Sequence, residues 1–413
     1  MPAHPFPLSR RSVLLGAASG AVAGTAAALT GCGAPSSNST IAEGTAPAPA
    51  RPSKPVSLSI LDVAGNRQLT QPMIDEYARA NPQVISKVTY SDSPSPDLIG
   101  KIKAQQGANR INIHMVLTGV DGLSAGIEQG LWTPLLPLYA DRLTGMRNYL
   151  EPAAKMQGLA GDHGIVVTYY PSGPLLEYLP DKVAQPPDSA RSLLAYAKAH
   201  KGRVQYARPS NSGPGRTFLM GLPYVLGDTN PADPENGWPK TWEFLKELGR
   251  YIDYYPSSTS ETMKNLASGT AEIIVTTTGW DINPRVLGTV PANAKITTLQ
   301  GFVWVTDAHY VVVPKGVAAD HLSAVLNLLA SMLTPEQQAK AYDDGYFYPG
   351  PAIKGVDLSM APEESRKALE KFGRPEYDQL ITSTRTQTPL EAKALVRAFD
   401  IWDREIGSGK VVS

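Results

Sequence analysis

Residues 113–132 read IHMVLTGVDGLSAGIEQGLW, and the change of pattern inside this stretch decides the fold. An apolar run from Ile111 to Leu117 is typical of a buried strand, and a glycine-rich turn leads from it into a short helical segment that ends at Gly130. Two strand–helix alternations precede this stretch, between residues 56 and 106. The β-α-β-α-β order predicts an α/β fold with a largely parallel sheet and helices on both of its faces.

Polar residues follow two of these strands at the point where each strand ends. Gly65 and Asn66 come after the strand at residues 56–61, and Asp121 follows the strand that ends at Leu117. Ligands of parallel sheets bind at the carboxyl ends of the strands, so we expect Asn66 and Asp121 to contact a ligand. Asp121 has an alternative role, because an aspartate at this position could cap the helix that follows it.

The second half of the chain continues the alternation and then becomes mainly helical, without an internal repeat. The length of 413 residues is enough for about two domains. Strands are expected at residues 164–170, 175–179, 203–206, 271–277 and 303–313, and helices at residues 189–200, 216–226, 241–251 and 320–333.

The composition excludes several kinds of partner and site. With 38 basic and 38 acidic side chains the chain has no net basic field, so nucleic acid is not an expected partner. The single cysteine, Cys32, excludes an internal disulfide and a thiolate metal cluster. We expect neither a cofactor nor a resident metal.

The N-terminus has the pattern of an export signal. Arg10-Arg11 precedes an uncharged run that lasts to Thr30 and is rich in glycine and alanine, which is typical of a twin-arginine signal peptide over residues 1–31. The alternative is a poor transmembrane anchor. The run ends with Leu29-Thr30-Gly31-Cys32, which resembles the lipobox of bacterial lipoproteins. That resemblance implies cleavage before Cys32 and attachment of lipid to its sulfur.

Residues 32–55 are dominated by Pro, Ala, Ser, Thr and Gly, a composition that cannot bury a core. We predict a disordered tether over this range. A lipid on Cys32 followed by a tether would hold the remaining chain at the outer face of the bacterial cytoplasmic membrane, or in the periplasm.

Three stretches resemble one protein family. They are residues 113–132, with Gly130-Leu131-Trp132 at the helix end; residues 267–280, with Gly269-Thr270-Ala271 and Gly279-Trp280; and residues 326–341, which read LNLLASMLTPEQQAKA. Together they resemble the extracellular solute-binding proteins of ATP-driven bacterial importers. The resemblance is to the family 1 type, whose members bind maltose, polyamines or iron.

This resemblance implies a type II periplasmic-binding-protein fold, in which two α/β lobes joined by a hinge close on a ligand. One lobe would contain residues 56–165 and 306–335, and the other residues 166–305 and 336–410. The protein would be a monomer that captures a small solute and passes it to the transmembrane subunits of an ABC permease. It would not be an enzyme.

The resemblance adds ligand candidates, each of which has a plainer role as well. Trp280 could offer a flat surface to a ligand or belong to the core. Ser210 and Ser212 precede a helix, so they could bind an anionic group or simply cap that helix. Acidic residues beside aromatic ones favour an organic cation such as a polyamine, with a sugar as the second choice. The full set of expected ligand contacts is Asn66, Asp121, Tyr169, Ser210, Ser212, Trp280, Asp281 and Asp307.

Parts of the sequence also match two other functions. Ferric ion could bind paired tyrosines such as Tyr169 and Tyr170, but neighbours in a strand point to opposite faces. A serine hydrolase is suggested by Gly122-Leu123-Ser124-Ala125-Gly126, which fits G-x-S-x-G. That motif requires its serine directly after a strand, whereas Ser124 lies seven residues beyond Leu117, inside an expected helix.

Overall fold

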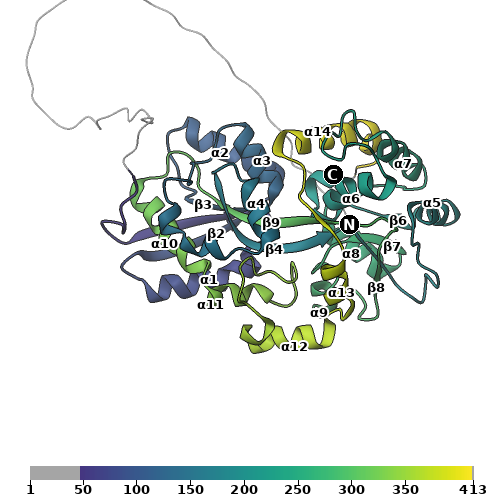
Figure 1. Cartoon of the computed structure of the whole chain (residues 1–413). Coiled ribbons are helices and arrows are strands. Elements are labelled where there is room, and N and C mark those ends of the chain that lie inside the picture. The colour runs from purple at the N-terminus through teal and green to yellow at the C-terminus, as the bar shows by residue number, and fades with distance from the viewer. Residues whose placement is uncertain (1–46, 412–413) are drawn as a thin grey trace, which may run out of the picture. The chain divides into compact units, whose positions relative to one another are not determined.

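The computed structural model describes residues 47–411. These residues belong to one compact unit and form two sheets surrounded by helices (Figure 1). The predicted signal peptide, Cys32 and the tether up to residue 46 lie outside the described residues. Among the helices that the structure describes, none is long and apolar enough to cross a membrane.

The first sheet contains the predicted β-α-β-α-β unit. Strand β1 (Val56–Asp62) pairs in parallel with β2 (Ile85–Asp92) on one side and with β3 (Met115–Thr118) on the other. The sheet order is β10-β9-β3-β1-β2, and β4 also pairs with β9. The three helices that follow these strands are α1 (Arg67–Ala80), α2 (Leu98–Gly107) and α3 (Val120–Glu128).

The glycines of helix α3 have a role in packing. The Trp132 indole lies on Gly126, where a Cβ atom would meet the ring at 2.0 Å, and its Nε1 donates to the Leu123 carbonyl oxygen at 3.1 Å. The glycine therefore lets a fully buried tryptophan lie against the helix. Strand β3 begins at Met115 rather than at Ile111 as predicted.

Two long buried strands connect the sheets. Strand β4 (Gly164–Gly173) runs antiparallel to β9 (Trp304–Val312), and every residue of both strands is buried. Strand β4 runs from the first sheet towards the second, and β9 returns in the opposite direction (Figure 1). The lobe boundaries predicted after residues 165 and 305 fall inside these strands.

The second sheet has the order β6-β7-β5-β8. Its strands are β5 (Leu175–Tyr178), β6 (Val204–Gln205), β7 (Ile273–Thr276) and β8 (Lys295–Thr297). The helices of this part of the chain are α5 (Ala190–Ala199), α6 (Gly213–Leu226), α7 (Pro239–Gly249), α8 (Thr259–Ser268) and α9 (Asn283–Val286).

Several C-terminal helices pack against the first sheet and the helices that follow its strands. Helix α10 (Ala319–Met332) lies against α1 and β1, and the segment from α11 (Pro335–Gln338) to Ile353 packs beside α1 and β4. The predicted change from the first to the second lobe after residue 335 falls inside α11. Helix α14 (Ala392–Trp402) packs against α3. The remaining elements are α4 (Glu151–Gly158), α12 (Glu363–Phe372), α13 (Glu376–Ser383) and β10 (Thr386–Gln387).

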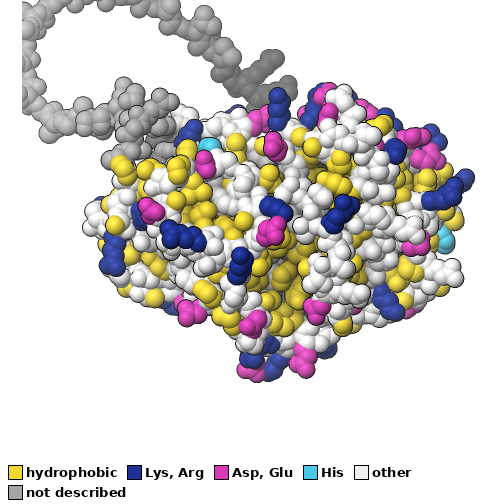
Figure 2. Space-filling view, viewed as in Figure 1, with side chains coloured by type: hydrophobic (Ala, Val, Ile, Leu, Met, Phe, Trp, Pro, Cys, Tyr) yellow, Lys and Arg dark blue, Asp and Glu magenta, His cyan; other side chains and the backbone are white. Residues whose placement is uncertain are grey.

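The last part of the predicted tether is attached to the folded body. The Ala48 N–H donates to the Tyr139 hydroxyl at 2.9 Å, and Arg142 Nη1 donates to the Pro49 carbonyl oxygen at 3.0 Å. The Ser53 N–H donates to Asp320 Oδ1 at 3.0 Å, at the first turn of α10. The amino-acid composition could not predict this attachment, because these contacts use backbone atoms, which any residue could supply. Elsewhere on the surface, acidic and basic side chains are interspersed (Figure 2).

Candidate functional site

A cavity of about 450 Å³ lies where the N-terminal ends of four helices meet. Helices α1 and α3 follow strands of the first sheet, whereas α6 and α8 belong to the part of the chain that forms the second. The residues at or before the first turn of each helix line the cavity, so it lies between the two sheets. Its lining includes Ala64, Gly65, Gly119, Asp121, Asn211, Ser212, Gly213, Arg216, Ser257, Ser258, Thr259 and Ser260.

Arg216 joins two carboxylates beside this cavity. It is the one charged residue in the sequence of α6, and its side chain is 7% exposed. Its Nη2 lies 2.5 Å from Asp307 Oδ2, and its Nη1 lies 3.3 Å from Asp121 Oδ1. We call Asp121, Arg216 and Asp307 the cavity cluster. Burial lowers the pKa of Arg216, but the two carboxylates outweigh this effect, so the pKa is raised and the guanidinium stays charged.

Neutral donors complete the cavity cluster. The Tyr170 hydroxyl donates to Asp307 Oδ2 at 2.9 Å, and the Ser95 hydroxyl donates to Asp121 Oδ2 at 2.6 Å. Burial, and then the charge of Asp307, raises the pKa of Tyr170 well above its usual value. Tyr170 therefore remains a protonated donor.

A neutral histidine lies next to this cluster. His309 lines the cavity, and its Nδ1 is 3.1 Å from Thr168 Oγ1, which in turn accepts from Asn66 Nδ2 at 2.9 Å. Burial lowers the pKa of His309 to about 4, so its ring is uncharged at neutral pH. His309 therefore adds no charge to the two carboxylates and one guanidinium of the cavity cluster.

One wall of the cavity is rich in hydroxyl groups and backbone N–H groups. We call residues 211–213 and 257–260 the hydroxyl wall. Ser212 and Ser258 are the N-caps of α6 and α8, and Ser212 Oγ lies 2.8 Å from Thr259 Oγ1, which joins the two helix ends. The first-turn N–H groups of Gly215 and Glu261 donate to Ser212 Oγ at 3.2 Å and to Ser258 Oγ at 3.3 Å, and Pro214 has no N–H. The first-turn N–H groups that remain for a bound group are those of Gly213, Thr259 and Ser260.

At the N-terminus of α1 a carboxylate of the chain accepts three backbone N–H groups, whereas in the hydroxyl wall Glu261 accepts only one, that of Ser257 at 3.0 Å. Asp62 accepts hydrogen bonds from the N–H groups of Ala64 at 2.9 Å, Asn66 at 3.3 Å and Arg67 at 2.8 Å. The donors at the α1 end are therefore used by the chain itself.

Aromatic side chains form another part of the lining. The rings of Trp280 and Tyr346 lie 5.4 Å apart, and those of Tyr346 and Phe347 lie 4.0 Å apart. Gly279 allows the two loops to meet, since its φ is +92° and a Cβ atom there would lie 2.3 Å from the Phe347 nitrogen. We call Trp280, Tyr346 and Phe347 the aromatic wall.

Five of the eight predicted ligand residues come together at this cavity. Asp121, Ser212 and Trp280 line it, and Asp307 and Asn66 lie behind the lining in contact with Arg216 and Thr168. Asp121 is not the N-cap of α3; Gly119 holds that position, and Asp121 lies in the first turn.

The other three predicted residues do not line the cavity. Tyr169 faces away from it, because Tyr170 occupies the cavity side of β4, and its N–H pairs with the Gly350 carbonyl oxygen at 2.8 Å. Ser210 donates to Asn211 Oδ1 at 3.1 Å and is not in the lining.

Asp281 belongs to a separate buried set of charges. Its side chain is 0% exposed, its Oδ2 lies 2.7 Å from Arg374 Nε, and Arg285 Nη2 lies 3.9 Å away. Glu177 on β5 completes this set, which we call the closed cluster. Within the described residues neither carboxylate oxygen of Glu177 has a hydrogen-bond partner, and burial raises its pKa well above the usual value.

Sequence reasoning missed Arg216 and most of the hydroxyl wall, although signals for both were present. Arg216 stands in the apolar sequence GPGRTFLMGLPYVL, where a buried charge requires a partner. Helix α8 was not predicted, yet Ser258 and Glu261 have the spacing of a helix start, and Ser258 Oγ accepts from the Glu261 N–H at 3.3 Å. The contributions of Ser95, Tyr346 and Phe347 arise from tertiary contacts.

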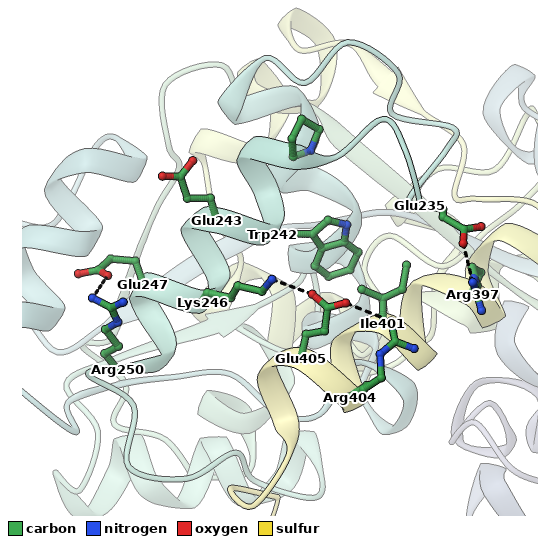
Figure 3. A pocket seen from close by; sticks show the side chains of 11 residues that line it. Glu235, Trp242, Glu243, Lys246, Glu247, Arg250, Arg397, Ile401, Arg404 and Glu405 are labelled. Atoms are coloured by element: carbon green, nitrogen blue, oxygen red, sulfur yellow. Dashed lines mark hydrogen bonds and ion pairs between the residues drawn. The ribbon is translucent and has the colours of Figure 1, made fainter.

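A larger cavity, of about 820 Å³, lies between α7 and α14 (Figure 3). Most of its charged side chains bind each other: Lys246 lies 2.7 Å from Glu405, Arg250 lies 2.7 Å from Glu247, and Arg397 lies 2.5 Å from Glu235. It is therefore a surface groove with internally paired charges, and we assign the candidate site to the smaller cavity. In residues 47–411 no group of three or more His, Cys, Asp or Glu side chains is placed to hold a metal ion.

The chain is similar to known proteins in sequence and in fold. A family model described as bacterial extracellular solute-binding protein matches residues 72–370. Protein YnjB from Escherichia coli K12 is 26% identical over 209 residues, which cover 46% of this chain and 50% of that protein. The match thus spans about half the length of this curated relative.

Solved structures share the fold at low sequence identity. An ABC transporter from Clostridium perfringens has a TM-score of 0.62 at 12% identity, covering 86% of this chain and 99% of that chain. AfuA from Actinobacillus pleuropneumoniae, with fructose-6-phosphate bound, has a TM-score of 0.60 at 16% identity, covering 86% and 99%. The spermidine/putrescine substrate-binding protein PotD from Streptococcus pneumoniae has a TM-score of 0.57 at 16% identity, covering 84% and 98%. These structures share the fold of this chain, and the names of AfuA and PotD give different solutes.

Proposed function

This chain belongs to the bacterial extracellular solute-binding proteins, and we propose that its cavity binds a small solute with a carboxylate or phosphate group for an ABC importer. The family consists of binding proteins rather than enzymes. The G-x-S-x-G sequence around Ser124 does not have the geometry of a hydrolase. Ser124 is buried within α3, whereas a nucleophilic serine of this motif lies on a turn directly after a strand.

The hydroxyl wall is the observation that carries the proposal. It combines the N-termini of two helices, α6 and α8, each of which contributes a partial charge of about +0.5. The serine and threonine hydroxyls, together with the first-turn N–H groups of Gly213, Thr259 and Ser260, favour a bound oxyanion. The aromatic wall then provides a surface for the uncharged part of the solute.

The organic cation predicted from the sequence has less support. That prediction counted three carboxylates, but Asp281 lies outside the cavity and both Asp121 and Asp307 are paired with Arg216. A cation remains the second candidate because Asp121 lines the cavity and its side chain is 17% exposed. Ferric ion is disfavoured because Tyr170 is held in its protonated form. A sugar could use the same aromatic wall without needing the oxyanion site.

Thermal unfolding with matched solutes tests the proposal. Solutes that carry phosphate or carboxylate should raise the Tm of the purified protein, because they bind the native state. Amine analogues of the same size should not. If amines alone raise the Tm, the cation takes the place of the anion. Replacing Thr259 with valine, which removes one hydroxyl from the hydroxyl wall, should reduce the shift that an anion produces.

We also propose that the protein is exported by the twin-arginine route and anchored by lipid on Cys32, close to its permease. The support is the sequence of residues 1–32, and none of it lies within the described residues. A Cys32→Ala variant should be released from the membrane fraction. Retention of an uncleaved variant in the membrane would identify a transmembrane anchor instead.

A further inference from the structure

We propose that Asp121 is a built-in competitor for the anionic solute. Its carboxylate pairs with Nη1 of the Arg216 guanidinium. An oxyanion must displace this carboxylate to bind the same nitrogen. This inference rests on the proposed function, since it assumes an anionic solute. It assigns Asp121 a role opposite to that of a ligand contact for a cation.

The two carboxylates on Arg216 are not equivalent. Asp307 is 2% exposed and lies 2.5 Å from Arg216, and it also accepts from the Tyr170 hydroxyl at 2.9 Å and from the Ala308 N–H at 2.9 Å. Asp121 lies 3.3 Å from Arg216, and its side chain is 17% exposed and lines the cavity. Asp307 is therefore the fixed partner and Asp121 the exchangeable one.

Two glycines leave the guanidinium accessible. A Cβ atom at Gly119 would lie 2.9 Å from Asp121 Oδ1 and 3.8 Å from Arg216 Nη2, and a Cβ atom at Gly213 would lie 3.9 Å from Arg216 Nη2. Both glycines line the cavity. Because neither has a side chain, an oxyanion can reach Arg216 from the cavity once Asp121 moves aside.

Asp121 has other favourable contacts to keep when it leaves Arg216. It lies in the first turn of α3, where the helix dipole stabilises a negative charge. The Ser95 hydroxyl donates to its other oxygen, Oδ2, at 2.6 Å. The displaced carboxylate would therefore remain solvated by protein groups, which keeps the cost of exchange small.

Competition of this kind determines specificity. A guanidinium can donate two parallel hydrogen bonds to one phosphate or carboxylate group. While Asp121 pairs with Nη1, only an oxyanion that binds Arg216 more strongly than this carboxylate is retained. Removing the charge of Asp121 should tighten binding of anions and relax the discrimination between strong and weak ones.

The test measures binding of inorganic phosphate and of 1,4-diaminobutane by calorimetry, using the parent protein and its Asp121→Asn variant. We expect the variant to bind phosphate about tenfold more tightly, the size of one coupled charge pair. Asp320→Asn is the matched control, because Asp320 is also a first-turn aspartate but contacts Ser53 away from the cavity. This control should bind phosphate like the parent.

The outcomes separate the two proposals. If the parent binds phosphate and Asp121→Asn binds it equally or more weakly, the competitor role is wrong and the proposed function stands. If the parent binds diaminobutane instead, and the variant loses that binding, both proposals are wrong. The same holds if neither probe binds. Should the asparagine variant fail to fold, Asp121→Ser removes the same charge and retains a first-turn oxygen.

Discussion

The cavity cluster and the closed cluster both pair aspartate with arginine, but in opposite arrangements. In the cavity cluster two aspartates share one arginine, and one of them, Asp121, is partly exposed to the cavity. In the closed cluster one fully buried aspartate, Asp281, lies between two arginines whose side chains are 6% and 7% exposed. The first arrangement has a carboxylate that can be exchanged, whereas the second has none.

The comparison shows that a carboxylate near a predicted ligand strand is not by itself a ligand group. Asp281 directly follows Trp280, which lines the cavity, yet its side chain is turned to Arg374. What distinguishes the two aspartates is the number of cations around each one and access to the cavity. Neither quantity can be read from the neighbouring sequence.

The largest expected effect is on stability, in the closed cluster. Asp281→Ala leaves Arg374 and Arg285 without their carboxylate in a buried environment, so we expect a loss of about 3–5 kcal/mol in the free energy of unfolding. Urea denaturation of the purified variant measures it. Asp121→Ala is the matched comparison and should lose much less, because Arg216 keeps Asp307. Equal losses would mean that the two clusters do not differ in the way described.

A second expected effect is on binding, in the cavity cluster. Arg216→Lys keeps one positive charge but removes the fork that reaches both Asp121 and the cavity, so we expect phosphate binding to weaken by about 2–3 kcal/mol. Calorimetry with inorganic phosphate measures the change. Arg374→Lys should lower the Tm and leave the phosphate affinity of the folded protein unchanged. The comparison fails if Arg374→Lys weakens phosphate binding as much as Arg216→Lys does.

Glu177 gives the closed cluster a pH dependence. Burial raises its pKa above the usual value, so on raising the pH above about 4.5 the unfolded chain loses this proton first and the folded state is destabilised. Glu177→Gln removes the effect, and we expect it to raise the free energy of unfolding by about 1–3 kcal/mol at pH 8. Denaturation curves at pH 8 and pH 4 measure this difference. An equal gain at both pH values would point to packing rather than to the charge.

His309 should give the cavity region the opposite pH dependence. Its pKa is lowered to about 4, so between pH 6.5 and 4 the unfolded state binds the proton first and stability falls as the pH falls. One unit below pH 6.5 the loss is about 1 kcal/mol. His309→Gln should flatten this part of the stability curve, as followed by Tm against pH. An unchanged slope would assign the acid sensitivity to other histidines, such as His114.

Much of the fold could be predicted because the pattern of apolar residues is local. The strands β1 and β4 and the helices α5 and α10 agree with the predicted ranges to within a few residues. The parallel order of the first sheet follows from the β-α-β alternation. Helix α4 was missed, because Glu151–Gly158 has a weak apolar pattern and depends on tertiary packing.

The site could be predicted only in part, for a physical reason. Asp121 and Trp280 were found because each follows a strand, and strand ends meet at one edge of a sheet. The hydroxyl wall and Arg216 lie at the N-terminal ends of α6 and α8, which belong to the part of the chain that forms the second sheet. Their distance from Asp121 depends on how the two sheets face each other. No single segment contains that information.

The ladder of β4 and β9 has a mechanical consequence. It joins the two sheets and also presents Tyr170 and His309 to the cavity, so a group bound at these residues lies near the axis about which the sheets would turn. Its lever arm is short, and it exerts little torque. Ser95 and Ser258 line the same cavity from outside the ladder, where an equal force acts on a longer arm. A solute that contacts these two serines therefore acts on the sheets through a longer arm than one that contacts only the ladder.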